Sequence, residues 1–437
     1  MHNKNYCRRS RCYFSAVLLG LTAVCQPLMA AEADSQFANA PSLTSAHLVE
    51  AVLARNPDIP AMQAAWIAAK ARVTPAESFD DPMLSYTVAP QTIGESGMNF
   101  GQKLSLSQRL PWPGKRDLRG DVASFEADAS FAGIDQARLK LTEEARSAYA
   151  DWYFIHASIR INGINKSLLQ EFRNIAEIKY AAGRASKQDA LRAEVEVALL
   201  EHRDIVLERR RGEVLAVLNT LLQRLPDQPL PLPADLPEAT PLQAVEQLRT
   251  AALATHPDLR ALAARIQAGR SRVALAKRDY YPDIQLSAGY NTLWNQDEKR
   301  LTVGAGINIP LQGKRRAAKD EARAGLMRLD LKHKGKVSQV LGAVQRAYDR
   351  VRESAHVITL YRNRLLPLAE ENLQAARSDY ESGSGNFLDL ISVEKNLMLT
   401  QLQLEQARAD YHRRLAALEH TVGGSKALHS ANSEENQ

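Results

Sequence analysis

The order of apolar and polar residues divides the chain into short segments with a period of two and long segments with the pattern of helices. The short segments form two pairs, at about 83–110 and about 284–310. In the clearest of them, Leu104 and Leu106 alternate with small or polar residues such as Ser105. A period of two predicts a β-strand with one apolar and one polar face, so each pair predicts a β-hairpin.

Long helices are predicted after each hairpin. Pro111-Trp112-Pro113-Gly114 ends the first hairpin, because proline cannot donate to a strand ladder. No proline occurs from Lys115 to Tyr180, and at ~1.5 Å per residue this segment predicts a helix on the order of 100 Å long. In the last predicted helix, at about 387–422, large side chains recur every seven positions, at Leu390, Leu397, Leu404, Tyr411 and Leu418. This repeat predicts left-handed supercoiling against a neighbouring helix.

The plan of helix, hairpin and helix occurs twice. Several pairs of similar residues are separated by 199 or 200 positions: Pro111 and Pro310, Gly114 and Gly313, Tyr180 and Tyr380, Gly183 and Gly383, Asp189 and Asp389. So many matches predict a tandem duplication of a unit of roughly 200 residues, longer than a solenoid repeat. The predicted organisation is a first repeat at 31–225, a proline-rich linker at 226–241, a second repeat at 242–424 and a disordered tail at 425–437.

Residues 1–30 have the pattern of a secretory signal peptide. Basic residues such as Lys4 and Arg8 precede an apolar run, Phe14 to Val24, and small residues follow at Ala30-Ala31. Loss of this segment would lower the formal net charge from +6 to +2, because it holds four basic residues and no acidic one. A nearly neutral mature chain disfavours nucleic acid as a partner.

No pattern in the sequence supports catalysis or metal binding. All three cysteines, Cys7, Cys12 and Cys25, lie in the predicted leader, so the mature chain is expected to have no disulfide and no thiol chemistry. A lipid-modified Cys25 is the alternative, which the bulky residue before it disfavours. The ten histidines show no metal-ligand spacing, and Gly114-Lys115 lacks the glycine that a phosphate loop needs at the position of Arg109. We expect no enzyme activity, cofactor or metal site.

The four predicted strands suit a membrane better than a soluble sheet. Each is close to the ~9–11 residues that cross a bilayer when tilted, and no segment has ~20 consecutive apolar residues. Four strands cannot close a barrel, whose smallest natural form has about eight, and lipid does not tolerate open strand edges. Several chains would therefore share one barrel, as a dimer with eight strands or a trimer with twelve. The alternative is a soluble α+β protein with two hairpins on a helical bundle.

From about Leu43 to Gly423, the chain resembles the TolC-type outer-membrane efflux proteins. The resemblance rests on the duplicated plan, on Leu110-Pro-Trp-Pro-Gly-Lys-Arg116 and on the paired Tyr-x-x-Gly turns. It implies a mainly α-helical homotrimer in the outer membrane, with a shared twelve-stranded barrel and a long helical tunnel in the periplasm. It also implies a passive exit duct that works with a periplasmic adaptor and an inner-membrane pump of the RND or a similar type.

The resemblance leaves the cargo open. The segment from Leu110 to Lys115 looks most like the branch that serves heavy-metal cation exporters, while drug or small-molecule efflux and type I protein secretion are the alternatives. A soluble periplasmic coiled-coil binding protein is the alternative of a different class.

The resemblance also implies a closed periplasmic tip that contacts the adaptor. Its residues are those of the two turns: Tyr180, Gly183, Asp189, Tyr380, Gly383 and Asp389. Gly385 and Ser392 depart from the family pattern, since some members carry a basic gate residue and a second acid there. The alternative reading is that both glycines end helices and both aspartates cap them.

A second predicted site is the junction between strands and helices. It comprises the prolines and glycines that end the strands, with one tryptophan: Pro111, Trp112, Pro113, Gly114, Pro282, Pro310 and Gly313. Trp112, Tyr280 and Tyr281 suit an aromatic girdle at the edge of the lipid. Lys103 and Arg109 are predicted to point into the barrel lumen, with plain solvation as the alternative.

Overall fold

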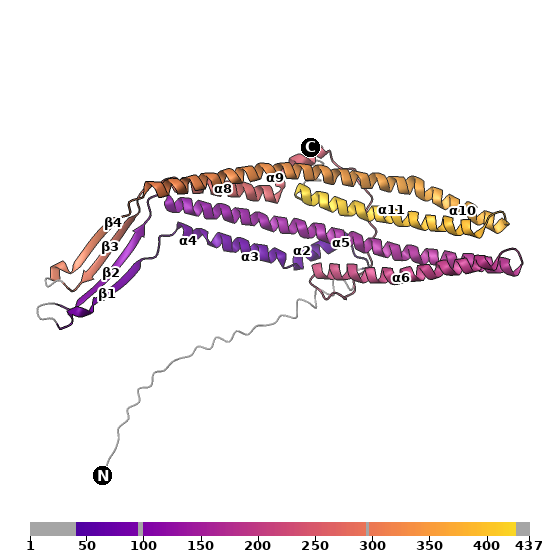
Figure 1. Cartoon of the computed structure of the whole chain (residues 1–437), viewed down its shortest axis with the longest axis horizontal. Helices are drawn as coiled ribbons and strands as arrows, with labels where there is room; N and C mark the ends of the chain where they lie inside the picture. Colours follow the sequence, from indigo (N-terminus) through magenta and orange to yellow (C-terminus); the bar gives the residue numbers. More distant parts are fainter. Residues whose placement is uncertain (1–40, 95–98, 294–296, 425–437) are drawn as a thin grey trace, which may run out of the picture. The chain divides into compact units, whose positions relative to one another are not determined.

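A computed structural model describes residues 41–94, 99–293 and 297–424. From residue 42 onward these residues belong to one unit. The predicted leader at 1–30 and the predicted tail at 425–437 lie outside the described residues. The fold is mainly α-helical with one small β-sheet at one end of the helices (Figure 1).

The two halves of the chain follow the same order of elements. The first half contains α2 (Ser45–Arg55), α3 (Asp58–Ala71), α4 (Val73–Glu77), β1 (Met83–Ala89), β2 (Gly101–Leu110), α5 (Lys115–Ala181) and α6 (Lys187–Leu221). The second contains α7 (Val245–Thr255), α8 (Pro257–Arg278), β3 (Ile284–Asn291), β4 (Leu301–Ile307), α9 (Gln312–Leu360), α10 (Leu366–Ser382) and α11 (Phe387–Val422). A short π-helical turn, Tyr361–Leu365, joins α9 to α10 just before Pro367.

The sheet is antiparallel, with the strand order β1-β2-β3-β4, so the central β2–β3 pair joins the two halves of the chain. Its register places apolar residues in rows across all four strands. Leu84, Leu106, Ala288 and Val303 form one such row, and Ser85, Ser105, Gly289 and Thr302 form the neighbouring row on the other face. The sheet therefore has one apolar face and one face of small and polar residues, as the period of two predicts.

Three elements begin or end a few residues away from the bounds that the sequence pattern suggests, and one helical segment is divided. β2 begins one residue after Phe100, and β4 ends at Ile307, three residues before Pro310, which has no N–H to donate. α6 ends at Leu221 instead of 225. The helical segment that opens the second repeat is divided into α7 and α8.

The break between α7 and α8 has the same cause as the break between α2 and α3. His256 is extended and its Nδ1 accepts a hydrogen bond from the N–H of Asp258 at 3.2 Å, which starts α8. Asn56 does the same with its Oδ1 and the N–H of Asp58, at 3.0 Å. Proline follows each capping residue and cannot continue the preceding helix.

Two apolar clusters of the described residues form much of the core of the helical part. One joins α7 and α8 to α9 and the second half of α11, and the other joins α5 and α6 to α10 and the first half of α11. The heptad positions predicted for the last helix all lie in the core, at 9% exposure or less: Leu390, Leu397, Leu404, Tyr411 and Leu418. α11 therefore packs against both halves of the chain.

The proline-rich linker is fixed to the helices by hydrogen bonds. The Tyr149 hydroxyl donates to the carbonyl oxygens of Leu43 and Ala234, at 2.9 and 2.8 Å, and the Trp152 indole donates to that of Pro231 at 3.1 Å. These contacts satisfy backbone groups that no helix or sheet pairs.

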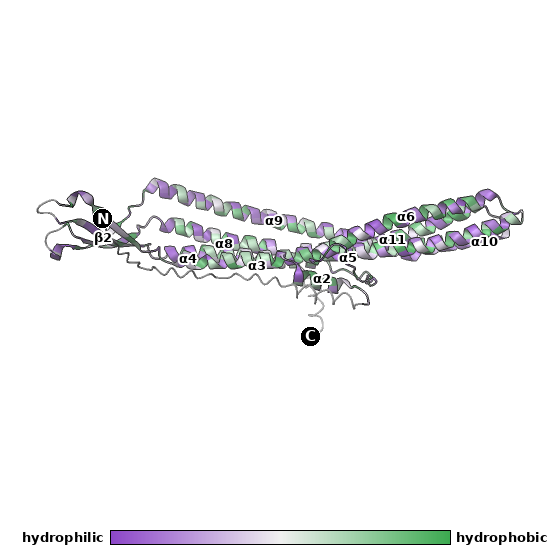
Figure 2. Ribbon diagram, turned by 90° about the horizontal axis from the view of Figure 1, so that it is seen from below, coloured by the Kyte–Doolittle hydropathy of each residue, from purple (hydrophilic) through white to green (hydrophobic). Residues whose placement is uncertain are grey.

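Among the described residues, no helix is long and apolar enough to span a membrane. Hydrophobic positions are interspersed with hydrophilic ones along the helices (Figure 2).

Candidate functional site

The junction of strands and helices is organised by Asp283, a buried carboxylate directly before β3. Its Oδ1 accepts hydrogen bonds from Lys115 Nζ at 2.8 Å and from the Trp112 N–H at 3.2 Å. Its Oδ2 pairs with Arg109 Nη2 at 2.6 Å. Lys115 also donates to the carbonyl oxygen of Tyr281 at 2.9 Å. Three donors from the end of β2 and the start of α5 thus meet one acid from the other half of the chain.

Both charges of the central pair are almost fully buried, with 2% of the Lys115 side chain and 7% of the Asp283 side chain exposed. Burial alone would raise the pKa of Asp283, but the hydrogen bonds from Lys115, Arg109 and the Trp112 N–H outweigh it and lower the pKa to about 2. Asp283 therefore stays ionised over the whole range in which the protein is expected to work.

The predicted junction residues surround this ion pair. Pro111 is buried, Trp112 stacks on Tyr281 with ring centroids 5.2 Å apart, and Pro282 immediately precedes Asp283. Gly114 has a φ of +82°, in the left-handed region, and the Arg278 guanidinium carbon lies 3.6 Å from where a Cβ would stand. Glycine is therefore required here on backbone grounds.

The other predicted junction residues lie outside the ion-pair cluster. Pro113 is exposed and Pro310 is half-buried. Gly313 lies in the first turn of α9, and a Cβ added there would have no other atom within 4 Å.

Lys103 and Arg109 lie on the small and polar face of the sheet, in the rows of Asn291 and Gln285. Lys103 is exposed, whereas half of Arg109 is covered and its guanidinium pairs with Asp283. Arg109 is therefore both partly solvated and held by an ion pair.

The two Tyr-x-x-Gly turns lie together at the end of the helices farthest from the sheet (Figure 1). Both glycines are left-handed, with φ of +70° at Gly183 and +89° at Gly383, and both end a helix as predicted. Lys179 of α5 reaches across and donates to the carbonyl oxygens of Tyr380 and Glu381. Its ammonium also lies 4.3 Å from the centre of the Tyr380 ring.

The two tyrosines of these turns have different environments. Tyr180 is 49% exposed, whereas Tyr380 is 4% exposed and packs on Phe387 with ring centroids 5.2 Å apart. The Tyr380 hydroxyl has no hydrogen-bond partner within the described residues, and burial raises its pKa to about 12, with a smaller contribution from Asp189.

The aspartates of the turns only partly follow the capping alternative. The Asp389 N–H donates to the side chain of Asn386, which is the true cap of α11, at 2.9 Å. In the first turn, Ser186 donates from its Oγ to Asp189 Oδ1 at 3.1 Å and makes no side-chain cap to the backbone. Neither carboxylate therefore caps its helix through its own oxygens.

Gly385, where the family resemblance would allow a basic gate residue, is packed against the end of α10. A Cβ there would stand 2.9 Å from Asp379 Cβ and 3.2 Å from the Tyr380 nitrogen. A longer side chain would require this turn to shift. The neighbouring pocket of about 420 Å³ is instead lined by basic residues of the first half, Lys179, Arg184 and Arg192, with Asp189 as its acid.

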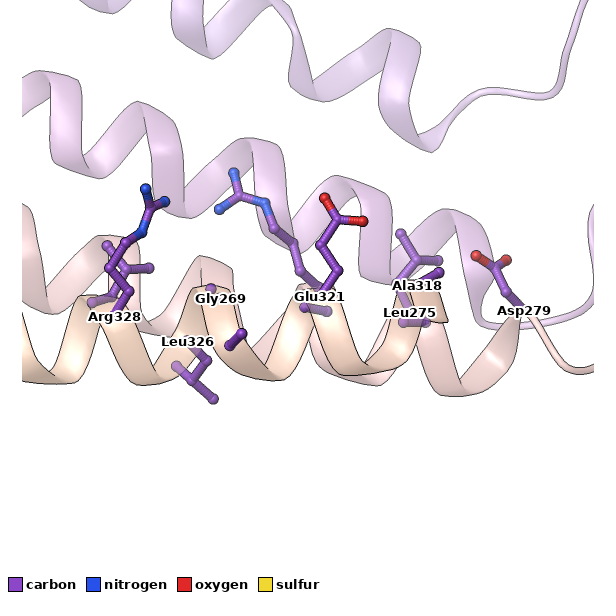
Figure 3. Close-up of a pocket in the computed structure, with 13 residues that line it drawn as sticks. Gly269, Leu275, Asp279, Ala318, Glu321, Leu326 and Arg328 are labelled. Carbon is purple, nitrogen blue, oxygen red and sulfur yellow. The ribbon is translucent and has the colours of Figure 1, made fainter. Parts of the chain in front are cut away.

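A groove of about 620 Å³ lies between α8 and α9 (Figure 3). Small residues let the two helices approach: a Cβ at Gly269 would stand 3.2 Å from Leu326. Glu321, Arg328 and Asp279 line the groove with no arrangement of nucleophile and base. Within the described part of the chain, no group of three or more His, Asp or Glu side chains could hold a metal ion.

Sequence reasoning missed two of the residues that connect the halves, Asp283 and Lys179. The only sequence signal for Asp283 is that a single acidic residue stands between Pro282 and the first apolar residue of a strand. The sequence around Lys115 was compared only with a phosphate-binding loop, so it did not suggest an ion pair. Lys179 has no signal, because its partners are backbone carbonyls about 200 positions away.

The sequence profile of the outer membrane efflux protein family matches two segments of the chain, 48–222 and 248–424. The chain belongs to this family. It is an outer-membrane protein of the class that forms the exit channels of tripartite efflux systems, and its two matched segments coincide with the two similar halves of the fold.

Similar proteins carry several different names. Nodulation protein T of Rhizobium leguminosarum bv. trifolii is 23% identical over 414 residues, which cover 88% of this chain and 86% of that protein. The pyoverdine export outer membrane protein OpmQ of Pseudomonas putida is 24% identical, with 86% and 79% covered. The cation efflux system protein CusC of Escherichia coli K12 is also 24% identical, with 62% and 58% covered.

Solved outer-membrane channels share the fold. The channel OprN superposes with a TM-score of 0.75 at 21% identity, covering 88% of this chain and 90% of that one. VceC of Vibrio cholerae superposes with a TM-score of 0.72 at 21% identity, covering 87% and 96%.

Replacing the buried acid tests the junction. Asp283→Asn should lower the free energy of unfolding by about 3–5 kcal/mol, because it leaves the buried Lys115 ammonium with a weaker partner. Thermal and denaturant unfolding followed by circular dichroism would measure the loss. Since the pKa of Asp283 is depressed in the folded state, the difference from wild type should be complete above about pH 4 and shrink as the pH falls toward 2.

A matched control is Asp320→Asn, which removes an exposed acid 3.9 Å from Arg323. Its effect should stay within about 1 kcal/mol. An equal effect of both substitutions, or a loss at Asp283 that does not depend on pH, would show that the ion pair does not hold the junction.

Proposed function

We propose that three copies of this chain form a passive exit duct through the outer membrane. In this proposal each copy contributes its four strands to one twelve-stranded barrel, and the helices continue the barrel as a tunnel into the periplasm. The observation that carries the proposal is the sheet, with one mainly apolar face and two unpaired edges.

The apolar face is exposed in the single chain. Ten of its large side chains are between 43% and 83% exposed: Leu84, Tyr86, Val88, Leu104, Leu106, Leu286, Tyr290, Leu301, Val303 and Ile307. An exposed apolar surface of this kind marks a contact with lipid or another protein. Lipid on this face and water on the small and polar face match the alternation of a transmembrane barrel strand.

The two unpaired edges of the sheet support the presence of further copies of the chain. β1 and β4 each pair with one strand only, so each presents unpaired backbone N–H and C=O groups. In lipid these groups have no water to pair with, and pairing β4 of one copy with β1 of the next removes both edges. Three copies supply twelve strands, which agrees with the trimer that the family resemblance implies.

In this proposal the duct has no energy source of its own, and an inner-membrane pump acts on it through a periplasmic adaptor. Membership of the efflux family supports such partners. Lys103 would face the lumen from the polar face of the sheet, while Arg109 would contribute there mainly through its ion pair with Asp283.

Heavy-metal cations are the cargo we propose for this duct. The similarity to CusC, whose name describes cation efflux, and the segment from Leu110 to Lys115 support it. The similarity to OpmQ, a pyoverdine exporter by name, favours small organic molecules as the second candidate. Selection among cargoes would then lie in the pump.

A pair of neighbouring substitutions in β2 tests the barrel. Leu106→Lys should abolish the heat-sensitive oligomer in the outer-membrane fraction, because a lysine on the lipid face near the middle of the bilayer costs about 2–4 kcal/mol in each copy. Ser107→Lys, on the opposite face, should leave the oligomer intact. The reverse result, or recovery of the wild-type chain in the soluble periplasm, contradicts the proposal.

A resistance profile of the deletion strain tests the cargo. Loss of the gene should increase sensitivity to heavy-metal cations more than to dyes and detergents, and plasmid-borne wild type should restore resistance. Complementation with the Leu106→Lys variant should fail. Sensitivity confined to organic compounds would contradict the heavy-metal proposal and support small organic molecules as the cargo.

Single-channel conductance tests the proposed tip. If Tyr380 and Asp389 help to close it, Tyr380→Phe combined with Asp389→Ala should raise the conductance in planar bilayers while the oligomer stays intact. Among the described residues of one protomer the Tyr380 hydroxyl has no hydrogen-bond partner, so the contacts that hold the closed tip would come from neighbouring copies. Unchanged conductance would leave both residues with a purely structural role.

A further inference from the structure

Glu394 of α11 is a carboxyl group buried in an apolar core. Its residue is 3% exposed, and its Oε1 has no hydrogen-bond partner within the described residues. An ionised carboxylate in such a place is strongly disfavoured unless it is paired. The sequence gives no sign that this glutamate is buried, because a charged side chain is normally expected at the surface even when it lies between heptad positions such as Leu390 and Leu397.

The surrounding core belongs to four helices. Leu390, Ile391 and Met398 flank Glu394 on α11, and the cluster that contains them also includes apolar residues of the other three helices. These are Leu169, Phe172 and Ala176 of α5, Ala193, Val197 and Leu200 of α6, and Tyr380 of α10, and the partly buried Leu373 and Ala376 of α10 pack against them. The core therefore joins the two helical hairpins that end in the tip turns.

The charges near this core do not neutralise Glu394. Glu196 of α6 acts on it as a like charge, and Lys395 of α11 is the one cation that favours its ionised form among the described residues. Three basic groups of the neighbouring helices have other partners. Lys179 of α5 donates to the second turn, Arg203 of α6 donates to Met398 at 3.7 Å, and Arg377 of α10 pairs with Glu171 and Glu381.

Burial raises the pKa of Glu394 to about 7, and repulsion from Glu196 adds to the effect. When the hairpins separate, the carboxyl meets water and regains the ordinary value of about 4.3. Between these two values the packed state holds a proton that the separated state does not. Raising the pH therefore favours separation, by up to about tenfold per pH unit between about pH 5 and pH 7.

We propose that Glu394 makes the packing of the two tip hairpins depend on protonation. With Glu394 neutral, α11 packs on α5 and α6 and the tip half of the helices is held together. With Glu394 ionised, the unpaired carboxylate and the Glu196 carboxylate both favour a looser arrangement. The proposal does not depend on the cargo, and it needs no partner other than a proton.

Amide hydrogen exchange of the purified full-length oligomer tests this, with rates corrected for the intrinsic effect of pH. In wild type, the opening equilibrium of residues 387–400 should rise by about fortyfold from pH 5 to pH 7 and then level off. Glu394→Gln cannot ionise, so the same segment should show no such rise. Glu196→Gln should keep the rise but end it at a lower pH.

The matched control is Glu194→Gln, which changes an exposed glutamate two residues from Glu196 and should follow the wild-type curve. Should Glu394→Gln fail to assemble, Glu394→Met provides a second uncharged side chain of similar length. A wild-type segment whose opening does not change with pH overturns the proposal, as does a pH dependence that survives in the Gln or Met variant. Both of these outcomes can be told apart from a failure of the proposed barrel, because loss of the barrel would be seen as loss of the oligomer.

Discussion

The buried ion pair of Asp283 and Lys115 is the contact on which the connection between sheet and helices depends. At this point β2 gives way to α5 within four residues, and two prolines leave the backbone with fewer donors than a continuous strand or helix would have. Asp283 accepts from Trp112, Lys115 and Arg109 together, which satisfies both charges and fixes the direction of the helix. A buried charge is tolerable only when it is paired in this way.

The duplication supplies two copies of one plan, and the structure uses them unequally. Asn56 and His256 break their helices by the same hydrogen bond, so the two halves share this feature although the residue type differs. At the tip the copies differ, because Tyr380 is buried under contacts from Lys179 while Tyr180 remains exposed. The first half thus holds the second turn in place.

Several groups in a single chain lack the partners that their chemistry calls for. The sheet has an exposed apolar face and two open edges, and the Tyr380 hydroxyl is buried without a hydrogen bond from the described residues. Each of these can be satisfied by lipid or by further copies, which is the arrangement proposed for this member of the efflux family. Glu394 differs from them, because it lies beside an apolar core that four helices of the same chain form, and a proton removes its charge there.

The sequence by itself determined the strands, the long helices, the duplication and the heptad positions of α11, because each depends on residues close together in the chain or on a fixed repeat. The family followed from the same patterns. Only the tertiary structure decided that Arg109 pairs with Asp283, 174 positions away, and that Lys179 binds the second turn. It also decided that residue 394 is buried. Such contacts depend on where whole helices lie, and no local pattern of apolar and polar residues records that.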